Sequence, residues 1–195
     1  MKLDRRQESE TDRQHLCDAL SALREGCRNR CAPCEPCCPR PQDRRCSPFC
    51  PEMREALSSD PANEPLEAGI APLVYQLKKL GVFQPFWSCE GHYGPDGDLW
   101  KSPRVWFFSN NVVHTRVLAE VLSELRLRNA IVCRWQVALA FCEPHNSGAA
   151  FALEPMPDER ASLGQLQSDA RRIARSLPDM LEEQITRIER ALKIS

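Results

Sequence analysis

The sequence lacks any apolar run near the roughly 18 residues that a membrane-spanning helix needs, which excludes a helical membrane protein. Its first residues, Met1 to Glu8, lack the apolar core of a secretory signal. It also lacks an excess of charge of one sign, because 26 basic and 27 acidic residues give a net charge of -1. Such a balance supplies no overall attraction to nucleic acid or to membranes. We therefore expect a soluble, cytoplasmic protein without a membrane partner.

Nucleotide-binding motifs and repeats are absent as well. The chain has neither a Gly-x-Gly-x-x-Gly fingerprint nor a Gly-x4-Gly-Lys-Ser/Thr loop, so nothing in it supports binding of nucleotide phosphates. There is no solenoid repeat and no long heptad run. What remains is a globular composition, 42% hydrophobic and 27% charged, over 195 residues. This length fits one α+β domain of about 100–150 residues and an appendage.

Hydrophobic periodicity predicts an α+β fold with the element order ββαββ. We expect a four-stranded antiparallel or mixed sheet with flanking helices and a C-terminal helical segment. A Cys/Pro-rich module, ordered by a metal, is expected to precede this domain in the chain. The expected helices span about 11–24, 72–80, 112–127 and 161–194, and the expected strands span about 82–89, 104–109, 131–142 and 149–153. Residues 58–65 form a linker between an N-terminal module, 1–60, and an α+β domain, 66–195.

Several residues predict where these elements begin and end. Gly26 and Gly81 are expected to end the first two helices, and Asn110 or Asn111 is expected to cap the third. Pro178 is expected to interrupt the C-terminal helical segment. Residues 91–97 contain three glycines and a proline, which indicates a long loop between the first two strands.

The cysteines are the most unusual feature, since eight of the 11 lie in the first 51 residues. Between residues 27 and 51, seven cysteines alternate with six prolines and almost no aliphatic side chains, so this segment cannot build a hydrophobic core. Two-residue gaps allow neighbouring thiolates to reach one ion. The predicted metal ligands are Cys27, Cys31, Cys34, Cys37, Cys38, Cys46 and Cys50.

The nature of the bound group stays open between Zn²⁺ and an iron-sulfur cluster. The run from Cys31 to Cys37 with a remote Cys50-Pro51 follows the spacing of bacterial ferredoxins, although Cys38 and Cys46 compete for the fourth place. Disulfide bonds and an unliganded segment are the weaker alternatives. Five arginines make the segment basic, which leaves a nucleic-acid partner open, but a solvated loop is favoured.

The run Cys34-Glu35-Pro36-Cys37-Cys38, with its flanking cysteines, resembles the iron- or zinc-chelating cysteine-rich family that carries a Cys-Cys pair. The resemblance covers about 25 residues and implies metal chelation. Cys27-x3-Cys31-x2-Cys34 also has the spacing of radical-SAM enzymes, but the elements downstream cannot form the (β/α) barrel that those enzymes use.

Two Cys-x2-His motifs follow predicted strands, at Cys89 to His92 and at Cys142 to His145. A single Cys2His2 zinc site is disfavoured, because one helix between the second and third strands places the two loops at opposite ends of the sheet. Elsewhere, Cys133 and Cys17 are expected to be buried apolar residues, and His114 is expected at the surface, at the start of a helix.

Ser88-Cys89-Glu90-Gly91-His92 is the better candidate for a single site. It places a thiol, a flexible glycine and an imidazole at a strand end, so Cys89 and His92 could form an activated nucleophile or a metal pair, or only a turn. Residues from about Phe83 to Pro155 resemble the wybutosine-synthesis methyltransferase family, in which an arginine stands where this chain has His92. That resemblance implies an enzyme that modifies RNA or a nucleotide.

The sequence therefore supports two hypotheses of function. The first is a cytoplasmic metal-binding protein, with zinc or an iron-sulfur cluster, whose role is structural, regulatory or assembly-related and whose protein partner is unknown. The second is a small RNA- or nucleotide-modifying enzyme with its catalytic site at Cys89 and His92. Loss of metal after replacement of Cys34, Cys37 and Cys38 by serine would support the first.

Overall fold

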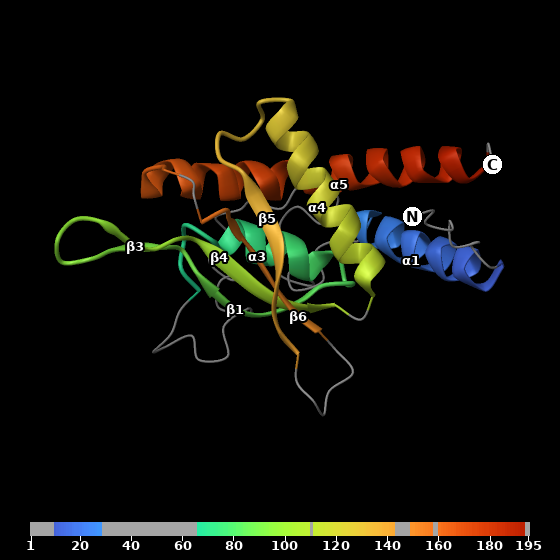
Figure 1. Ribbon diagram of the computed structural model, residues 1–195, viewed down its shortest axis with the longest axis horizontal. Coiled ribbons are helices and arrows are strands. Elements are labelled where there is room, and N and C mark those ends of the chain that lie inside the picture. The colour runs from blue at the N-terminus through green and yellow to red at the C-terminus, as the bar shows by residue number, and fades with distance from the viewer. Residues whose placement is uncertain (1–9, 29–65, 110, 143–148, 158–159, 194–195) are drawn as a thin grey trace, which may run out of the picture.

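A computed structural model describes residues 10–28, 66–109, 111–142, 149–157 and 160–193 (Figure 1). The described residues form an α+β fold, as predicted. Its helices are α1 (Glu10–Arg28), α3 (Ala71–Lys79), α4 (Val112–Leu127) and α5 (Leu163–Lys193). Its strands are β1 (Gln84–Cys89), β2 (His92–Tyr93), β3 (Leu99–Lys101), β4 (Arg104–Ser109), β5 (Trp135–Cys142) and β6 (Ala149–Pro155).

The main sheet has four strands in the order β1-β4-β6-β5, and every neighbouring pair is antiparallel. Of the two options that the sequence leaves open, the antiparallel sheet is therefore the correct one. In β4, Val105, Phe107 and Ser109 are buried while the residues between them are half-buried, because alternate side chains of a strand point to opposite faces. The helices pack on the face that carries Val105 and Phe107.

The opposite face of the sheet carries a cluster of aromatic rings from β1 and β4. Phe86 stacks on Phe108 with ring centroids 4.4 Å apart, and Trp87 lies 5.0 Å from Trp106. Phe86 and Trp87 are neighbours in sequence yet contact the same group of rings, because the register of β1 against β4 shifts between Pro85 and Trp87.

Helix α5 is the element that unites the helical layer, since it packs against α1, α3 and α4 (Figure 1). The predicted interruption at Pro178 is wrong, because α5 runs through it as one helix of 31 residues. Buried Ala174 and Leu177 before the proline and Leu181 after it continue one apolar stripe. Packing of this stripe outweighs the hydrogen bond that a proline removes.

Helix α1 belongs to the same core, although the sequence assigns it to the N-terminal module. Its Leu20 and Leu23 are buried together with residues of α3, α4 and α5. Gly26 does not end the helix as expected, because α1 continues to Arg28. A Cβ atom at Gly26 would lie 2.1 Å from the carbonyl oxygen of Leu80, so this glycine allows α1 to touch the end of α3.

The expected loop after β1 contains a second, two-stranded sheet formed by β2 and β3. Strands of two and three residues around Gly94 and Gly97 are too short to give a periodic pattern. Among the other expected boundaries, those of α4 and β4 match, Gly81 follows α3 with φ +74°, and the Asn111 side chain caps α4 by accepting a hydrogen bond from Val113 N at 2.9 Å. The strand expected over 131–142 begins later, at Trp135.

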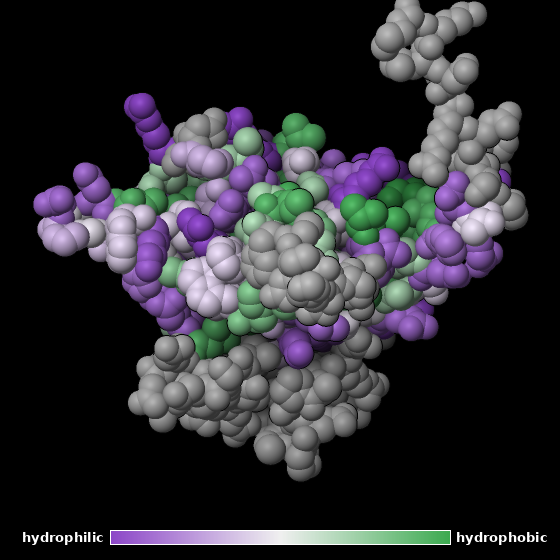
Figure 2. Space-filling view, turned by 60° about the horizontal axis from the view of Figure 1, so that its bottom comes forward, coloured by the Kyte–Doolittle hydropathy of each residue, from purple (hydrophilic) through white to green (hydrophobic). Residues whose placement is uncertain are grey.

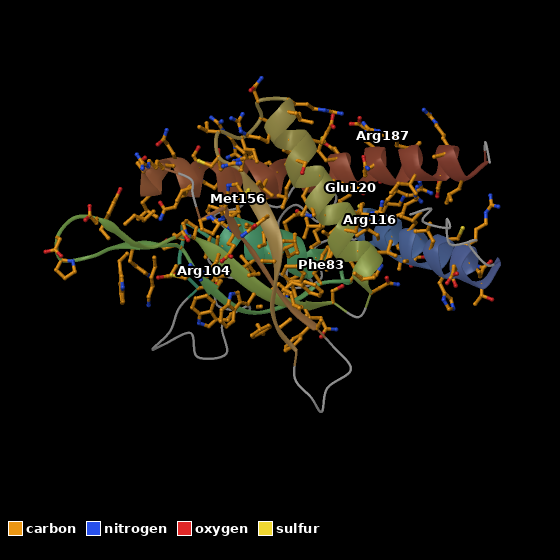
Figure 3. The ribbon with its side chains drawn as sticks, viewed as in Figure 1. Phe83, Arg104, Arg116, Glu120, Met156 and Arg187 are labelled. Carbon is orange, nitrogen blue, oxygen red and sulfur yellow. The ribbon has the colours of Figure 1, made fainter. Side chains whose placement is uncertain are left out.

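Polar and apolar side chains share the described surface, on which Phe86, Trp87, Tyr93 and Trp100 are exposed. Figure 2 shows hydrophilic and hydrophobic residues interspersed over the described part of the face that it presents. A groove between α4 and α5 is bordered by Arg116, Glu120 and Arg187 (Figure 3), and its charges are of both signs. Among the described helices, none is long and apolar enough to cross a membrane.

Candidate metal centre

Three side chains with metal-binding chemistry come together at the end of β1. A carboxylate oxygen of Glu67, the thiol sulfur of Cys89 and a ring nitrogen of His92 all lie within 4.8 Å of one another. His92 Nε2 is 3.0 Å from Glu67 Oε1. Cys89 is buried, whereas the side chains of His92 and Glu67 are 44% and 32% exposed, so the group opens to solvent on one side.

Cys89 and His92 are positioned by the turn that leaves the strand. Cys89 is the last residue of β1 and His92 the first of β2. Gly91 between them has φ +88°, and a Cβ atom there would lie 2.6 Å from Leu163 and 2.9 Å from the carbonyl oxygen of Lys101. Only glycine fits both the backbone conformation and this space. The Gly91 N–H donates a hydrogen bond to Cys89 Sγ at 3.4 Å, which helps to orient the sulfur.

Glu67 reaches the same place from the segment just before α3. Its carbonyl oxygen accepts hydrogen bonds from the N–H groups of Ile70 and Ala71, which form the turn that leads into the helix. Its carboxylate spans the gap to the strand end, with Oε1 on His92 and Oε2 accepting a hydrogen bond from Glu90 N at 2.7 Å. The side chain is therefore held at both of its oxygens.

This donor set could hold a single metal ion. Zn²⁺ binds thiolate, imidazole and carboxylate at about 2.0–2.3 Å in a tetrahedron, which places donor atoms about 3.3–3.8 Å apart. Donors already within 4.8 Å of one another need to close by about 1.5 Å at most. An iron-sulfur cluster is a poorer match, since it takes thiolate from several cysteines. Three protein ligands leave a fourth position for water or for a substrate.

The sequence identified Cys89 and His92 but missed Glu67. Glu67 lies 22 positions before Cys89, between the expected linker and the expected second helix, and nothing in its spacing connects it with the motif. The connection is tertiary, because α3 packs against β1 and brings the preceding turn to the strand end. Proximity of an acidic turn to a Cys-x2-His motif could be inferred only after this packing was known.

Of the seven cysteines predicted to bind metal, Cys27 lies in a described segment, at the end of α1; Cys31, Cys34, Cys37, Cys38, Cys46 and Cys50 lie outside the described residues. Burial, and after it the nearby Glu182, raises the pKa of the Cys27 thiol to about 12. In this environment the thiol is protonated at neutral pH. That the seven cysteines bind metal stays a prediction.

The second Cys-x2-His motif does not meet the first. β4 and β5 both pair antiparallel with β6 and so run in the same direction, while β1 runs opposite to both. Cys89 is therefore level with Arg104, and Cys142 is level with Ser109, at the other end of β4. The predicted separation of the two cysteines is confirmed, and His145 lies outside the described residues.

Burial of the remaining candidates differs from expectation in two cases. Cys133 is buried in the core, as predicted. Cys17 was predicted to be buried but is exposed, because it lies beside the buried stripe of α1 that contains Leu20 and Leu23 and not within it. His114 was predicted at the surface but is only 7% exposed, because α1 packs over the start of α4. Its Nε2 donates a hydrogen bond to the carbonyl oxygen of Ala19 at 3.0 Å.

His114 predicts a dependence of stability on pH. Burial lowers its pKa from the ordinary 6.5, and the bond to Ala19 offsets this only in part. The unfolded chain therefore binds the proton more tightly, so the free energy of unfolding should fall as the pH drops through about 6.5 toward the lowered folded pKa. Urea unfolding at pH 7.5 and 5.5 should show a smaller loss in His114→Gln than in the wild type, and an unchanged loss in the exposed control His15→Gln. Equal losses in all three proteins would contradict this role.

The comparisons with known proteins add no family to this geometry. No protein-family model matches the chain, and neither the search of curated proteins nor that of solved structures found a match. The two resemblances drawn from the sequence stay predictions, and function has to be argued from the site.

Proposed function

We propose that this chain is a zinc-binding protein whose α+β domain holds one ion through Glu67, Cys89 and His92. The observation that carries the proposal is the convergence of a carboxylate, a thiol and an imidazole within 4.8 Å, from two segments separated in sequence. One thiolate and one carboxylate balance the charge of Zn²⁺, so the loaded centre is neutral. The solvent-exposed side leaves room for an exchangeable fourth ligand, as in zinc sites that act on substrates.

The cysteine-rich module keeps its place in this proposal as a second, separate metal site. Its ligands would come from the seven clustered cysteines, with zinc or an iron-sulfur cluster as the bound group. The module would serve a structural, regulatory or assembly-related role beside the α+β domain. We expect the protein to act in the cytoplasm.

One observation favours a second candidate function. His92 Nε2 contacts Glu67 Oε1 at 3.0 Å, and a histidine held by a carboxylate beside a cysteine is the arrangement of a base that activates a nucleophile. In this alternative Cys89 attacks the substrate, and the resemblance to the wybutosine-synthesis family implies RNA or a nucleotide. The same three residues would then work without a resident metal.

Metal analysis of the full chain separates these functions. In a variant here named the six-serine chain, Cys31, Cys34, Cys37, Cys38, Cys46 and Cys50 are replaced by serine. We expect this chain, purified anaerobically, to retain about one Zn²⁺ by elemental analysis, because the ligands in the α+β domain are intact. Adding Cys89→Ser should remove that ion, and adding the exposed control Cys17→Ser should not.

Three results would decide against the proposal. A six-serine chain without zinc, even after zinc is supplied and excess is removed, would overturn the centre. Retention of zinc after Cys89→Ser would show that the ion lies elsewhere. Rapid alkylation of Cys89 by iodoacetamide that depends on His92 in a metal-free chain would favour the nucleophile instead.

A further inference from the structure

The motif Cys89-Glu90-Gly91-His92 offers three side chains that could bind a metal, yet only two of them join the centre. The carboxylate of Glu90 does not belong to the group of Glu67, Cys89 and His92, and its Oε2 accepts a hydrogen bond from Gly69 N at 2.6 Å. The third donor is Glu67 instead. The sequence does not show which glutamate is the donor, because Glu90 is the nearer of the two to Cys89 and His92 along the chain.

The two glutamates connect the same two segments in opposite directions. Glu67, before α3, accepts a hydrogen bond from the backbone N–H of Glu90 at 2.7 Å, and Glu90, after β1, accepts one from the backbone N–H of Gly69 at 2.6 Å. Each carboxylate thus holds the backbone that carries the other. This reciprocal pair fixes the distance between the turn that supplies Glu67 and the turn that supplies Cys89 and His92.

A third element braces the pair. Gln167 of α5 donates a hydrogen bond from Nε2 to the carbonyl oxygen of Glu90 at 3.1 Å. A Cβ atom at Gly69 would lie 2.7 Å from Glu90 Oε2 and 2.8 Å from Gln167 Nε2, so both side chains close directly over this glycine. Residues of three elements therefore converge at one point behind the ligands.

We infer that Glu90 and Gln167 are positioning residues of the metal centre, with Glu90 acting through its carboxylate oxygen on Gly69 and Gln167 through its amide on the Glu90 backbone. This inference rests on the proposed function. Residues that orient the ligands of a metal contribute about 10- to 100-fold to its affinity. They do so because the ligands are then held near their bound positions before the ion arrives.

The test measures the affinity of the six-serine chain for Zn²⁺ by competition with a chromophoric chelator. Glu90→Ala and Gln167→Met, which keeps the length of the side chain but removes its donor, should each weaken binding about 10- to 100-fold. Glu90→Gln keeps an oxygen acceptor for Gly69 N and should recover affinity to within about threefold of the parent. Gln14→Met, an exposed glutamine of α1, is the matched control and should bind as the parent does.

A cobalt spectrum and a melting curve distinguish positioning from general damage. In the Co²⁺-loaded protein, Gln167→Met should alter the visible bands that report ligand geometry, while the melting temperature of the metal-free chain changes by less than about 4 °C. Parent-like affinity in both Glu90→Ala and Gln167→Met would overturn the inference. So would a Glu90→Gln chain that binds as weakly as Glu67→Gln, because Glu90 would then be a ligand. If the parent binds no zinc, the proposed function itself fails, and this inference fails with it.

Discussion

Replacement of His92 by alanine in the six-serine chain is expected to lower its affinity for Zn²⁺ by about 100- to 1000-fold. Structural zinc sites with four ligands bind with about 10–16 kcal/mol, so one ligand contributes about 2.5–4 kcal/mol, which is two to three powers of ten. The contact of His92 with Glu67 at 3.0 Å places the imidazole ring at the centre. Because the His92 side chain is half-exposed, we expect its replacement by alanine to cost little folding stability.

The size of this effect separates a ligand from a residue that positions one. The expected loss for His92→Ala exceeds the 10- to 100-fold expected of residues behind the ligands. The exposed His15 on α1 provides the matched control, and His15→Ala should bind zinc as the parent does. Isothermal titration of metal-free protein measures both variants. An affinity of His92→Ala within about tenfold of the parent would remove His92 from the ligand set.

Periodic elements were predicted well because their pattern is local. Residues 112–127 carry apolar side chains at helical spacing, residues 104–109 contain a run of four β-branched or aromatic side chains, and the boundaries of both match those of α4 and β4. Strands β2 and β3 were not predicted, because two or three residues are too few to show a periodic pattern. His114 and Cys17 were misplaced for a related reason, since which side of α1 and α4 is covered depends on how these two helices meet.

The residues of the candidate centre show the same difference between local and long-range information. Cys89, Gly91 and His92 lie within four consecutive residues, so the sequence alone indicated a site, and the positive φ of Gly91 confirms the expected close approach. Glu67, Gly69 and Gln167 come from other elements and meet the motif only through the packing of α3 and α5. Half of the constellation thus depends on long-range contacts that carry no signature in spacing or composition.

Replacement of Asp169 by alanine should have the largest effect on stability. Asp169 is 1% exposed on α5, and its carboxylate accepts hydrogen bonds from Val132 N at 3.0 Å and Cys133 N at 2.7 Å, in the segment that leads into β5. Its removal leaves two backbone N–H groups without their acceptor, at about 1–3 kcal/mol each, and a cavity besides. We expect a loss of about 3–5 kcal/mol in the free energy of unfolding, a large part of the 5–15 kcal/mol typical of a domain.

Two control variants and a measurement of the affinity for Zn²⁺ make this prediction specific. Asp169→Asn keeps an oxygen that can accept both hydrogen bonds, so urea denaturation should show a loss of about 1 kcal/mol, and the exposed control Asp179→Ala should show about 0.5 kcal/mol or less. A loss below about 1 kcal/mol in Asp169→Ala would contradict the role.

Asp169 lies two positions after Gln167, and two positions turn a helix by about 200°. Helix α5 therefore anchors β5 from one side and the metal centre from the other, and Asp169→Asn should leave the affinity for Zn²⁺ unchanged while Gln167→Met lowers it.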